Sequence, residues 1–456
     1  MISKGKSSPC DQRFKETTVG KIPIDWQLAK AEEYCFRVTD GTHSTPQKMN
    51  KGKHLVTSKH LTEGEIDFNE AYLISKEDFN EINRRSKVEQ WDVIIGMIGE
   101  YLGGTYLEKN KDINYAIKNV GLFKCAGDIN KGKWLYYYLS SKIAKEYVAM
   151  SRSGTSQPYI TLNSLREFPV ISPENPFEMQ KIIFIIDSIQ YEINLLSDMN
   201  RTLEAIGQAV FKRWFVDFEF PNEEGKPYKS SGGEMIYNSV LDKEIPAKWA
   251  PKEIGDIAKI NERSINRSFE YSEIEYIDID SVDQGIIRNR QILRLEDAPS
   301  RAKRIVKNQD IIISTVRPNL KHFAFIQNVA PNTIVSTGFA VITPMKGTSK
   351  FLYYHLTTDK FTNYLSAIAD SHTSTYPSFN PDIIQKSVVA YPDSNEKQVT
   401  TNLPALFDLI LEGLFCKVEN NSKQISTLSQ LRDMLLPKLM SGKIRVPIQK
   451  ETMEIQ

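Results

Sequence analysis

The stretch EMQKIIFIIDSIQYEINLLSDMNRTLEAIGQAVF, residues 178–211, carries apolar side chains at steps of four and three residues. The apolar positions are Ile182, Ile186, Ile189, Ile193, Leu196, Leu203 and Val210. Asn200 and Gly207 interrupt the series. Such spacing is typical of the a and d positions of a heptad, so it predicts a long helix that packs against another helix. With a rise of about 1.5 Å per residue, this helix would be roughly 50 Å long.

A later stretch repeats the pattern. Its apolar positions are Leu403, Phe407, Ile410, Leu414, Leu428, Leu431 and Leu435, and the polar residues between them are Lys417, Asn421 and Gln424. At an offset of 221 residues Asn200 falls on Asn421, and a polar residue in a helix seam fixes register at some cost in stability. Pro404 fits the first turn of a helix, so this helix should begin near Asn402.

We expect these two helices to pack against each other as an antiparallel coiled coil that holds two globular blocks apart, because their apolar seams are in register. The alternative is a pair of independent amphipathic helices, each lying on its own domain.

The rest of the chain is also duplicated. Four segments return in the same order, namely Ile22–Trp26 as Ile245–Trp249, Asp92–Ile95 as Asp310–Ile313, Trp134–Leu139 as Phe351–Leu356 and, more loosely, Gly154–Pro158 as Thr373–Pro377. Two copies fit, which indicates a tandem duplication and not a solenoid. The duplication predicts two similar surfaces related by a pseudo-twofold axis.

Each copy begins with a strand-rich block, in which short β-branched or aromatic runs are broken by Gly, Pro and Asn. Strands are predicted at Val93–Ile98, Glu275–Ile279, Ile311–Val316 and Phe339–Thr343, and helices at Trp134–Ala149 and Lys350–Ala369. The predicted fold class is therefore α+β, with two similar mixed blocks and two long helices. The predicted order is an N-terminal extension (1–16), the first block (17–172), the first long helix (173–217), a linker rich in Gly, Pro and Ser (218–240), the second block (241–391), the second long helix with its tail (392–444) and a C-terminal extension (445–456).

Composition is that of an ordinary globular protein, with 40% hydrophobic and 25% charged residues among 456. This length predicts more than one domain. No apolar run is long enough to span a membrane, and the polar N-terminus lacks the apolar core of a signal peptide. The four cysteines are far apart in the sequence and form no CxxC pair, which argues against a zinc site or a disulfide framework and fits a reducing cytoplasm.

The net charge of +1 does not indicate nucleic-acid binding. One stretch departs from this balance, because it gathers Arg288, Arg290, Arg294, Arg301, Lys303, Arg304 and Lys307. Such a cluster could neutralise phosphates. The alternative is an ordinary solvated surface stretch.

Catalytic motifs are nearly absent from the sequence. A methyltransferase acting on amines needs a Gly-rich cofactor loop, which is missing, and neither Asn175-Pro176-Phe177 nor Ser156-Gln157-Pro158-Tyr159 completes the loop that holds the target amine. Asp217 with Glu224-Gly225-Lys226 has the residue types of a nuclease but lies in the predicted linker. There is no P-loop, no HExxH and no Cys/His cluster, so the sequence favours binding over catalysis, and neither a catalytic residue nor a metal site is predicted.

The order of these segments resembles the specificity subunit of Type I restriction–modification systems over essentially the whole chain. The residues that carry the resemblance are Ile22-Pro23 with Trp26, Asp40–Pro46, Asp92–Ile95, Gly154–Gln157, Trp214–Pro221 and Leu431–Ile444. The second copy departs from the first, because Asn261-Glu262-Arg263-Ser264 stands where the first copy has Asp40–Pro46.

The resemblance implies two target-recognition domains that each recognise one half of a split double-stranded DNA site, with helices that set the distance between the halves. It also implies two modification subunits, which bring S-adenosylmethionine and the methyltransferase chemistry, and motor–nuclease restriction subunits. This chain would hold no cofactor and would act without catalytic activity of its own in the cytoplasm of a bacterium or archaeon. The aromatic segment 211–218 would be a docking patch for a partner or would tuck into the fold. The expected docking residues are Phe211, Trp214, Phe215, Leu435, Leu436 and Leu439.

Candidate DNA-binding residues share short hydroxyl groups, amides or cations in predicted loops, since such groups contact phosphates and base edges. In the first copy they are Thr42, His43, Ser44, Thr45, Lys48, Arg152, Ser153, Thr155, Ser156 and Gln157. In the second copy they are Arg288, Arg290, Arg301, Lys303, Arg304, Arg317, His372, Thr373, Ser374 and Tyr376. For the Thr42–Thr45 loop, the alternative is a turn whose hydroxyls bond to their own backbone.

Overall fold

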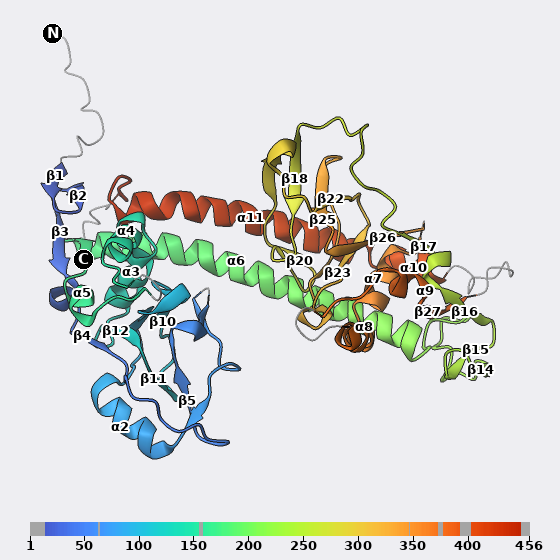
Figure 1. The fold of residues 1–456 in the computed structure, drawn as a ribbon, viewed down its shortest axis with the longest axis horizontal. Helices are drawn as coiled ribbons and strands as arrows, with labels where there is room; N and C mark the ends of the chain where they lie inside the picture. The colour runs from blue at the N-terminus through green and yellow to red at the C-terminus, as the bar shows by residue number, and fades with distance from the viewer. Residues whose placement is uncertain are drawn as a thin grey trace, which may run out of the picture. The chain divides into compact units, whose positions relative to one another are not determined.

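The computed structural model describes residues 14–62, 64–154, 158–345, 347–372, 377–392 and 403–447. The chain divides into two compact units. Unit 1 comprises Met1–Leu195 and Ile425–Gln456, and unit 2 comprises Leu196–Gln424. Each unit combines a strand-rich block with parts of the long helices (Figure 1). In these described ranges, no helix combines the length and the apolar character needed to cross a membrane.

The main sheet of unit 1 is antiparallel and places its strands in the order β10 (Thr105–Leu107), β9 (Val93–Gly96), β12 (Val120–Lys124) and β4 (Arg37–Asp40). A smaller sheet has the order β11 (Tyr115–Ile117), β5 (Lys53–Val56) and β8 (Leu73–Ile74), with β11 and β5 parallel. Three pairs complete the unit, namely β1 (Phe14–Thr17) with β2 (Gly20–Pro23), β3 (Trp26–Lys30) with β13 (Pro169–Pro173) and β6 (Leu61–Thr62) with β7 (Glu65–Ile66). Strand β9 is buried along its length, which explains why its sequence is continuously apolar and does not alternate.

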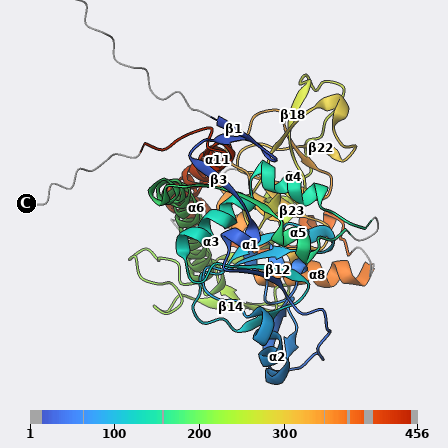
Figure 2. The ribbon, with the colours of Figure 1, turned by 90° about the vertical axis from the view of Figure 1, so that its left-hand side faces the viewer.

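The helices of unit 1 are α1 (Ala31–Tyr34), α2 (Lys76–Ser86), α3 (Ile129–Leu139), α4 (Lys142–Met150) and α5 (Leu162–Arg166). In both views α2 and α3 lie on either side of β12 (Figures 1 and 2). The prediction of one helix at Trp134–Ala149 was wrong, because the chain breaks between α3 and α4. Ser141 begins the new helix, and its hydroxyl accepts a hydrogen bond from the backbone N–H of Ala144 at 3.3 Å.

Unit 2 repeats the main sheet strand for strand, in the order β24 (Phe323–Phe325), β23 (Ile311–Ser314), β26 (Phe339–Pro344) and β17 (Ala258–Ile260). Its second sheet has the order β21 (Gln291–Arg294), β18 (Glu273–Ile277), β25 (Thr333–Ser336) and β22 (Ala302–Ile305), with β18 and β25 parallel. The remaining pairs are β14 (Met235–Asn238) with β15 (Lys243–Pro246), β16 (Trp249–Glu253) with β27 (Val388–Pro392) and β19 (Val282–Asp283) with β20 (Ile286–Ile287). The internal duplication predicted from the sequence is therefore confirmed in the fold.

Unit 2 contains α7 (Ser349–Leu356), α8 (Asp359–His372) and α9 (Asp382–Lys386). Here too a single helix was predicted where two exist, and the hydroxyl of Thr358 accepts a hydrogen bond from the N–H of Phe361 at 3.3 Å at the start of α8. The segment predicted as a linker packs on this unit. Phe218 and Phe220 are buried, and the rings of Phe220 and Tyr228 stack with centroids 4.7 Å apart.

The long helices are α6 (Pro176–Phe211), which continues as a π-helical turn (Lys212–Val216), and the pair α10 (Leu403–Ile410) and α11 (Glu412–Met440). Both units show the predicted antiparallel packing. In unit 1, Arg432 donates to the side-chain oxygen of Gln190 at 2.8 Å. In unit 2, the Asn421 amide donates to the Asn200 oxygen at 2.8 Å. The seam polar residues thus bond to each other, as a register-fixing pair should.

The seam predicted for the second helix was partly wrong. Ile410 and Leu431 are exposed, whereas Leu411 is buried and Val418, Ile425 and Arg432 are partly buried. Half of the predicted seam, a set of positions seven residues apart that includes Phe407, is correct. In the other half the seam residue follows the predicted one by one position, as Leu411 follows Ile410 and Arg432 follows Leu431. The chain also interrupts the helix at Leu411, between α10 and α11.

Gly207 interrupts the first seam because a side chain there would overlap a buried ring of unit 2. An added Cβ would lie 1.9 Å from Oη and 2.4 Å from Cζ of Tyr354. Replacing Gly207 with alanine should gain about 1 kcal/mol of helix propensity but cost more through displacement of the ring, since overpacking costs about 1–3 kcal/mol. We expect urea unfolding to show a net loss for unit 2. The control is Gly413→Ala in α11, where no atom lies within 4 Å of the new Cβ; it should be stabilising, and equal effects of the two variants would refute this account.

Glu204 of α6 should make the stability of unit 2 depend on pH. Burial raises the pKa of its carboxyl to about 7, while Gln208 donates to it at 3.2 Å. Because the pKa in the folded chain exceeds the usual value of 4.5, the protonated form is favoured by folding. This contribution is fully present below about pH 4.5 and is lost as the pH rises through 7. Between about pH 5 and pH 8 the free energy of unfolding should fall by about 1–3 kcal/mol more in the wild type than in Glu204→Gln, at roughly 1.36 kcal/mol per pKa unit. Parallel pH profiles of the two proteins would contradict this.

Candidate nucleic-acid interface

The loop after β4 in unit 1 is held by a cation that the sequence analysis missed. Arg85 of α2 donates through Nη2 to Asp40 Oδ1 at 2.9 Å and to the carbonyl oxygens of Asp40 and Gly41 at 3.1 and 2.8 Å. Gly41 permits this close packing, because a Cβ there would lie 2.5 Å from the carbonyl oxygen of Ile117. These contacts of Arg85 hold the start of the loop against α2. The sequence does not distinguish Arg85 from the neighbouring Arg84 of α2, so its contact with the Asp40 loop could not be predicted.

His43 has both ring nitrogens engaged at the base of this loop. Nε2 lies 2.8 Å from Asp40 Oδ2, and Nδ1 lies 3.0 Å from the side-chain oxygen of Asn119. His43 therefore orients the loop, although its side chain is 67% exposed. The hydroxyl of Thr42 accepts from the N–H of Ser44 at 3.2 Å, so the predicted alternative of a self-bonded turn is also present.

The groups that this loop presents outward are Ser44, Thr45 and Lys48, which are all exposed. Lys118, on the turn beside the loop, donates to the Thr45 hydroxyl at 2.5 Å and adds a second cation. Hydroxyl groups next to cations suit contacts to phosphate oxygens and base edges.

The segment around Arg152 is linked to the same part of unit 1. Ser153 and Tyr159 exchange two backbone hydrogen bonds of 2.9 Å, and Gly99 donates to the carbonyl oxygen of Pro158 at 2.8 Å. The Ser58 hydroxyl donates to the carbonyl oxygen of Asn119 and accepts from the N–H of Met97, both at 3.2 Å. The predicted loops thus converge on the end of β9, with Arg152 and Ser153 exposed.

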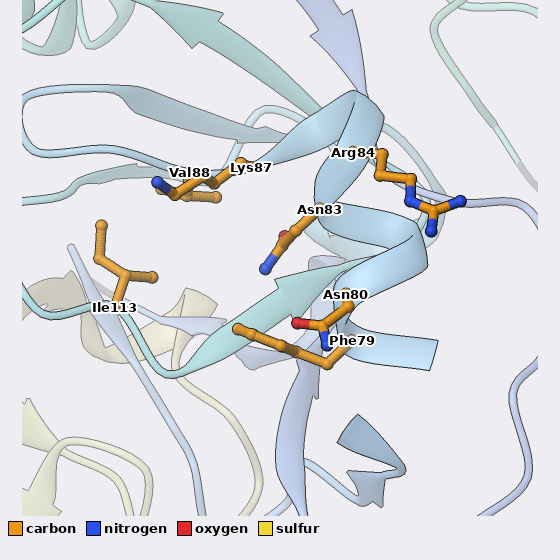
Figure 3. Close-up of a pocket in the computed structure, with 7 residues that line it drawn as sticks. All are labelled: Phe79, Asn80, Asn83, Arg84, Lys87, Val88 and Ile113. Atoms are coloured by element: carbon orange, nitrogen blue, oxygen red, sulfur yellow. The ribbon is translucent and has the colours of Figure 1, made fainter. Parts of the chain in front are cut away.

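A pocket of about 330 Å³ lies beside α2, and its lining is drawn in Figure 3. The amides of Asn80 and Asn83 point toward Ile113, whereas the guanidinium of Arg84 points away from them (Figure 3). The pocket therefore gathers amide and apolar groups on its inner side. Arg85 of the same helix binds the Asp40 loop. We therefore assign the candidate interface to the face of α2 that contacts this loop, and not to the pocket.

A buried aspartate marks the start of the central strand in each unit. Asp92 accepts from Lys124 Nζ at 3.1 Å and from the N–H of Cys125 at 2.9 Å. Asp310 accepts from Arg263 Nη2 at 2.5 Å and from the Thr343 hydroxyl at 2.9 Å. Burial raises the pKa of both carboxyls, and the two cations oppose that effect.

Arg263 therefore has a structural partner in unit 2. The segment Asn261–Ser264, which replaces the Asp40–Pro46 loop, directs this arginine toward the buried Asp310 carboxylate, which is 0% exposed. The exposed residues of this segment are Glu262 and Ser264, in place of the exposed Ser44, Thr45 and Lys48 of unit 1. The two units thus differ at equivalent positions of a shared frame.

The turn after β23 in unit 2 carries the predicted residue Arg317, which is exposed. Arg317 and Lys321 adopt left-handed backbone conformations, with φ of 47° and 57°. Such a conformation costs a residue other than glycine about 1–2 kcal/mol. Lys321 donates to Asp359 at 2.7 Å, but with Asp359 82% exposed such a pair contributes about 0–1 kcal/mol. This ion pair does not offset the backbone cost.

The basic cluster predicted in unit 2 does not form one patch. Arg288, Arg290 and Arg294 lie on or beside β21, whereas Arg301, Lys303 and Arg304 lie on or beside β22, at the opposite edge of the sheet. Arg290 pairs with Glu275 at 3.2 Å, Arg288 with Asp283 at 2.6 Å, and Arg304 is partly buried. Arg301 and Lys303 are exposed.

Several predicted docking residues are buried inside the chain. The exposed fractions of Phe211, Phe215 and Leu439 are 3%, 5% and 2%. The rings of Phe211 and Phe215 pack against Phe407, with centroids 6.1 and 5.1 Å apart. Phe211 and Phe215 lie in the core of unit 2 and Leu439 lies in the core of unit 1. These three side chains therefore cannot form an open docking patch as they lie here. The partly buried residues Trp214, Leu435 and Leu436 pack at the edges of the same cores.

Some predicted contact residues lie outside the described part of the chain, namely Thr155, Ser156, Gln157, Thr373, Ser374, Tyr376 and the side chain of His372. Within the described part, no group of three or more His, Cys, Asp and Glu side chains is placed to hold a metal ion.

Comparison with known proteins identifies relatives along the whole chain. A model of the Type I restriction modification DNA specificity domain matches residues 246–403. Identity to the Type I restriction enzyme MjaIX specificity subunit of Methanocaldococcus jannaschii is 26% over 450 residues, which cover 96% of this chain and 97% of that protein. Identity to the Type I restriction enzyme HindI specificity subunit of Haemophilus influenzae is 29% over 194 residues, which cover 41% of this chain and 39% of that protein.

A solved structure has the same fold. The crystal structure of the Type-I restriction-modification system S subunit from M. genitalium matches with a TM-score of 0.52 at 15% identity, and the match covers 91% of this chain and 96% of that one.

Proposed function

We propose that this chain, which is similar over 96% of its length to a Type I restriction enzyme specificity subunit and carries a match to the DNA specificity domain of such systems, is itself a specificity subunit and recognises a two-part, asymmetric DNA sequence with its two units. It works as the sequence-recognition subunit of a methyltransferase and endonuclease complex in the cytoplasm of a bacterium or archaeon. Two modification subunits supply S-adenosylmethionine and the methyltransferase chemistry, and motor–nuclease restriction subunits supply cleavage.

One observation carries this proposal, namely that the two units have the same main sheet but different exposed segments. Unit 1 has a fixed loop with Ser44, Thr45 and Lys48 after β4, whereas unit 2 directs Arg263 into its interior at that place. After the central strand, unit 2 exposes Arg317 where unit 1 has Gly99. Because base recognition depends on the side chains that reach base edges, two unlike sets of exposed groups favour two unlike half-sites.

A methyl-transfer assay distinguishes this function from a stand-alone enzyme. The full chain is incubated with DNA and labelled methyl donor, first alone and then as the complex with its modification subunits. We expect transfer from the complex and none from the chain alone, since the sequence carries no methyltransferase cofactor loop. Transfer by the chain alone would refute the proposed role.

Methylation-sensitive sequencing of DNA modified by the complex then identifies the site. Two different half-sites at a constant separation are expected, and identical half-sites would contradict the asymmetric assignment. A protein-binding scaffold is excluded if the complex binds DNA with a sequence preference and an affinity that falls as salt rises.

A further inference from the structure

The turn after the central strand has left-handed residues at the same two places in both units, but these residues are glycines in unit 1 and basic residues in unit 2. In unit 1 its two left-handed positions are Gly99 and Gly103, with φ of 74° and 85°. In unit 2 the corresponding positions are Arg317 and Lys321, with φ of 47° and 57°. A short 3-10 helical segment lies in each turn. In unit 1 it begins at the first glycine and covers Gly99–Tyr101, and in unit 2 it lies between the two basic residues, at Pro318–Leu320.

Hydrogen bonds confirm that the positions correspond. Gly99 donates to the carbonyl oxygen of Pro158 at 2.8 Å, and Arg317 donates to the carbonyl oxygen of Pro377 at 2.8 Å. The strand residue two positions earlier also agrees, because Met97 accepts from Ile160 at 2.9 Å and Thr315 accepts from Phe379 at 3.0 Å. Both turns are thus tied to the segment that contains the predicted hydroxyl-rich loop of their unit.

Glycine would be the favoured residue at both positions of unit 2, since it adopts a left-handed conformation without steric cost. Unit 1 shows that this turn forms with glycine at both places. The turn therefore forms without a basic residue at either position. Residues kept in costly backbone conformations cluster at sites of function.

The surroundings of Arg317 suit contact with a nucleic acid. Arg317, Asn319 and Leu320 are exposed, whereas Pro318 is buried, so one side of the turn faces solvent. The hairpin β19–β20 supports it, because Gln284 donates to the carbonyl oxygen of Lys321 at 3.1 Å and Gly285 donates to that of Phe323 at 2.8 Å. Arg288 follows this hairpin and is also exposed.

We propose that Arg317 determines base preference in the half-site recognised by unit 2, where its guanidinium pairs with a guanine. The inference rests on the proposed function and adds a residue and a base to it. Guanine is the base indicated because a guanidinium matches its O6 and N7 acceptors with two parallel hydrogen bonds in the major groove. The matching turn of unit 1 exposes Glu100 and Tyr101 instead, so that half-site is recognised by other chemistry.

Arg317→Gly tests the proposal in the full chain assembled with its modification subunits. Because glycine relieves the left-handed backbone, the melting temperature of the variant should equal or exceed that of the wild type. Methylation-sensitive sequencing should show that discrimination at one guanine of one half-site falls about 5- to 150-fold, the range expected for a two-bond base contact. The other half-site should not change.

Gln309→Gly is the matched control. Gln309 is exposed and left-handed, with φ of 71°, and lies at the opposite end of β23. It should give a similar gain in melting temperature and leave the recognised sequence unchanged. Arg317→Lys keeps the charge but lacks the planar pair of donors, so it should retain affinity for DNA and lose the guanine preference.

The outcomes separate the inference from the proposed function. If Arg317→Gly and Arg317→Lys both methylate the wild-type sequence with full discrimination, the inference is refuted and the proposed function stands. If Arg317→Gly lowers the melting temperature while Arg317→Lys keeps the guanine preference, Arg317 has a structural role and the inference is also refuted. If the wild-type complex shows no sequence preference, the proposed function itself fails.

Discussion

Replacing Arg445 with alanine is expected to lower the free energy of unfolding of unit 1 by about 3–5 kcal/mol, the usual cost of removing one partner from a buried ion pair. Arg445 Nε and Nη2 donate to the two oxygens of Glu178 at 2.6 and 2.9 Å, and Glu178 is 1% exposed. Two more hydrogen bonds join Arg445 to Asp25 at 2.9 and 2.6 Å. The substitution would leave the buried carboxylate with the indole N–H of Trp26 at 3.3 Å but without a cation.

Urea unfolding with hydrogen exchange of β3 and β13 measures this loss where it arises. Arg432→Ala is the control, because Arg432 on α11 donates at 2.8 Å to the neutral side chain of Gln190 and at 2.9 Å to the carboxylate of Asp433, which is 65% exposed and not buried. A single hydrogen bond of this kind contributes about 0.5–1.5 kcal/mol. The double variant Arg445→Ala/Glu178→Gln removes the buried charge and should recover part of the loss. If Arg445→Ala costs no more than Arg432→Ala, the buried ion pair does not stabilise unit 1 as argued.

Replacing Asp408 with alanine is expected to destabilise unit 2 by about 3–5 kcal/mol. Asp408 of α10 caps α7, accepting from the backbone N–H groups of Ser349, Lys350 and Phe351 at 2.9, 3.0 and 3.2 Å. It also accepts from the Ser349 hydroxyl at 2.7 Å. All three residues are buried, so water cannot replace the carboxylate. A buried donor left without a partner costs about 1–3 kcal/mol.

Asp408→Asn is the matched control, because the amide keeps one acceptor oxygen and nearly the same shape but loses the charge. We expect it to cost about 1–2 kcal/mol, in the range of an ordinary helix cap. Hydrogen exchange of the first turn of α7 should rise strongly in Asp408→Ala and modestly in Asp408→Asn. If the two substitutions lower the free energy of unfolding equally, the contribution of Asp408 to stability does not come from capping α7.

The periodicity and the internal repeat of the sequence predicted the long helices and the duplicated strands. Helix α6 and the pairing of Asn200 with Asn421 follow from the heptad spacing, and the duplicated strands follow from matched segments. The shift at Ile410 and Leu431 was not predictable from apolarity alone, because both residues are apolar but face solvent, whereas the seam position 432 holds an arginine. Likewise, Ser141 and Thr358 divide predicted helices because hydroxyl caps compete with continuation of the helix.

Contacts between segments far apart in the sequence were not predictable. Arg85, Asn119 and Asp408 carry no local signal, and each acquires its role from a partner more than 40 residues away. Phe215 shows the opposite case, since a residue predicted for docking is buried inside the fold. For the candidate surface, the sequence predicted which loops to consider, but not which of their side chains hold the loop and which point outward.

The composition of unit 1 determines when it can be completed during synthesis. Its strand-rich block and the first part of α6 are among the earliest residues to leave the ribosome, yet Leu439, Met440 and Arg445 are among the last described. Unit 2 is one continuous segment and can fold while the chain is still growing. Ile182 and Ile186 must meanwhile wait for the last turns of α11. A nascent chain that stops before residue 425 would therefore hold a complete unit 2 and an unfinished unit 1 with apolar side chains open to aggregation.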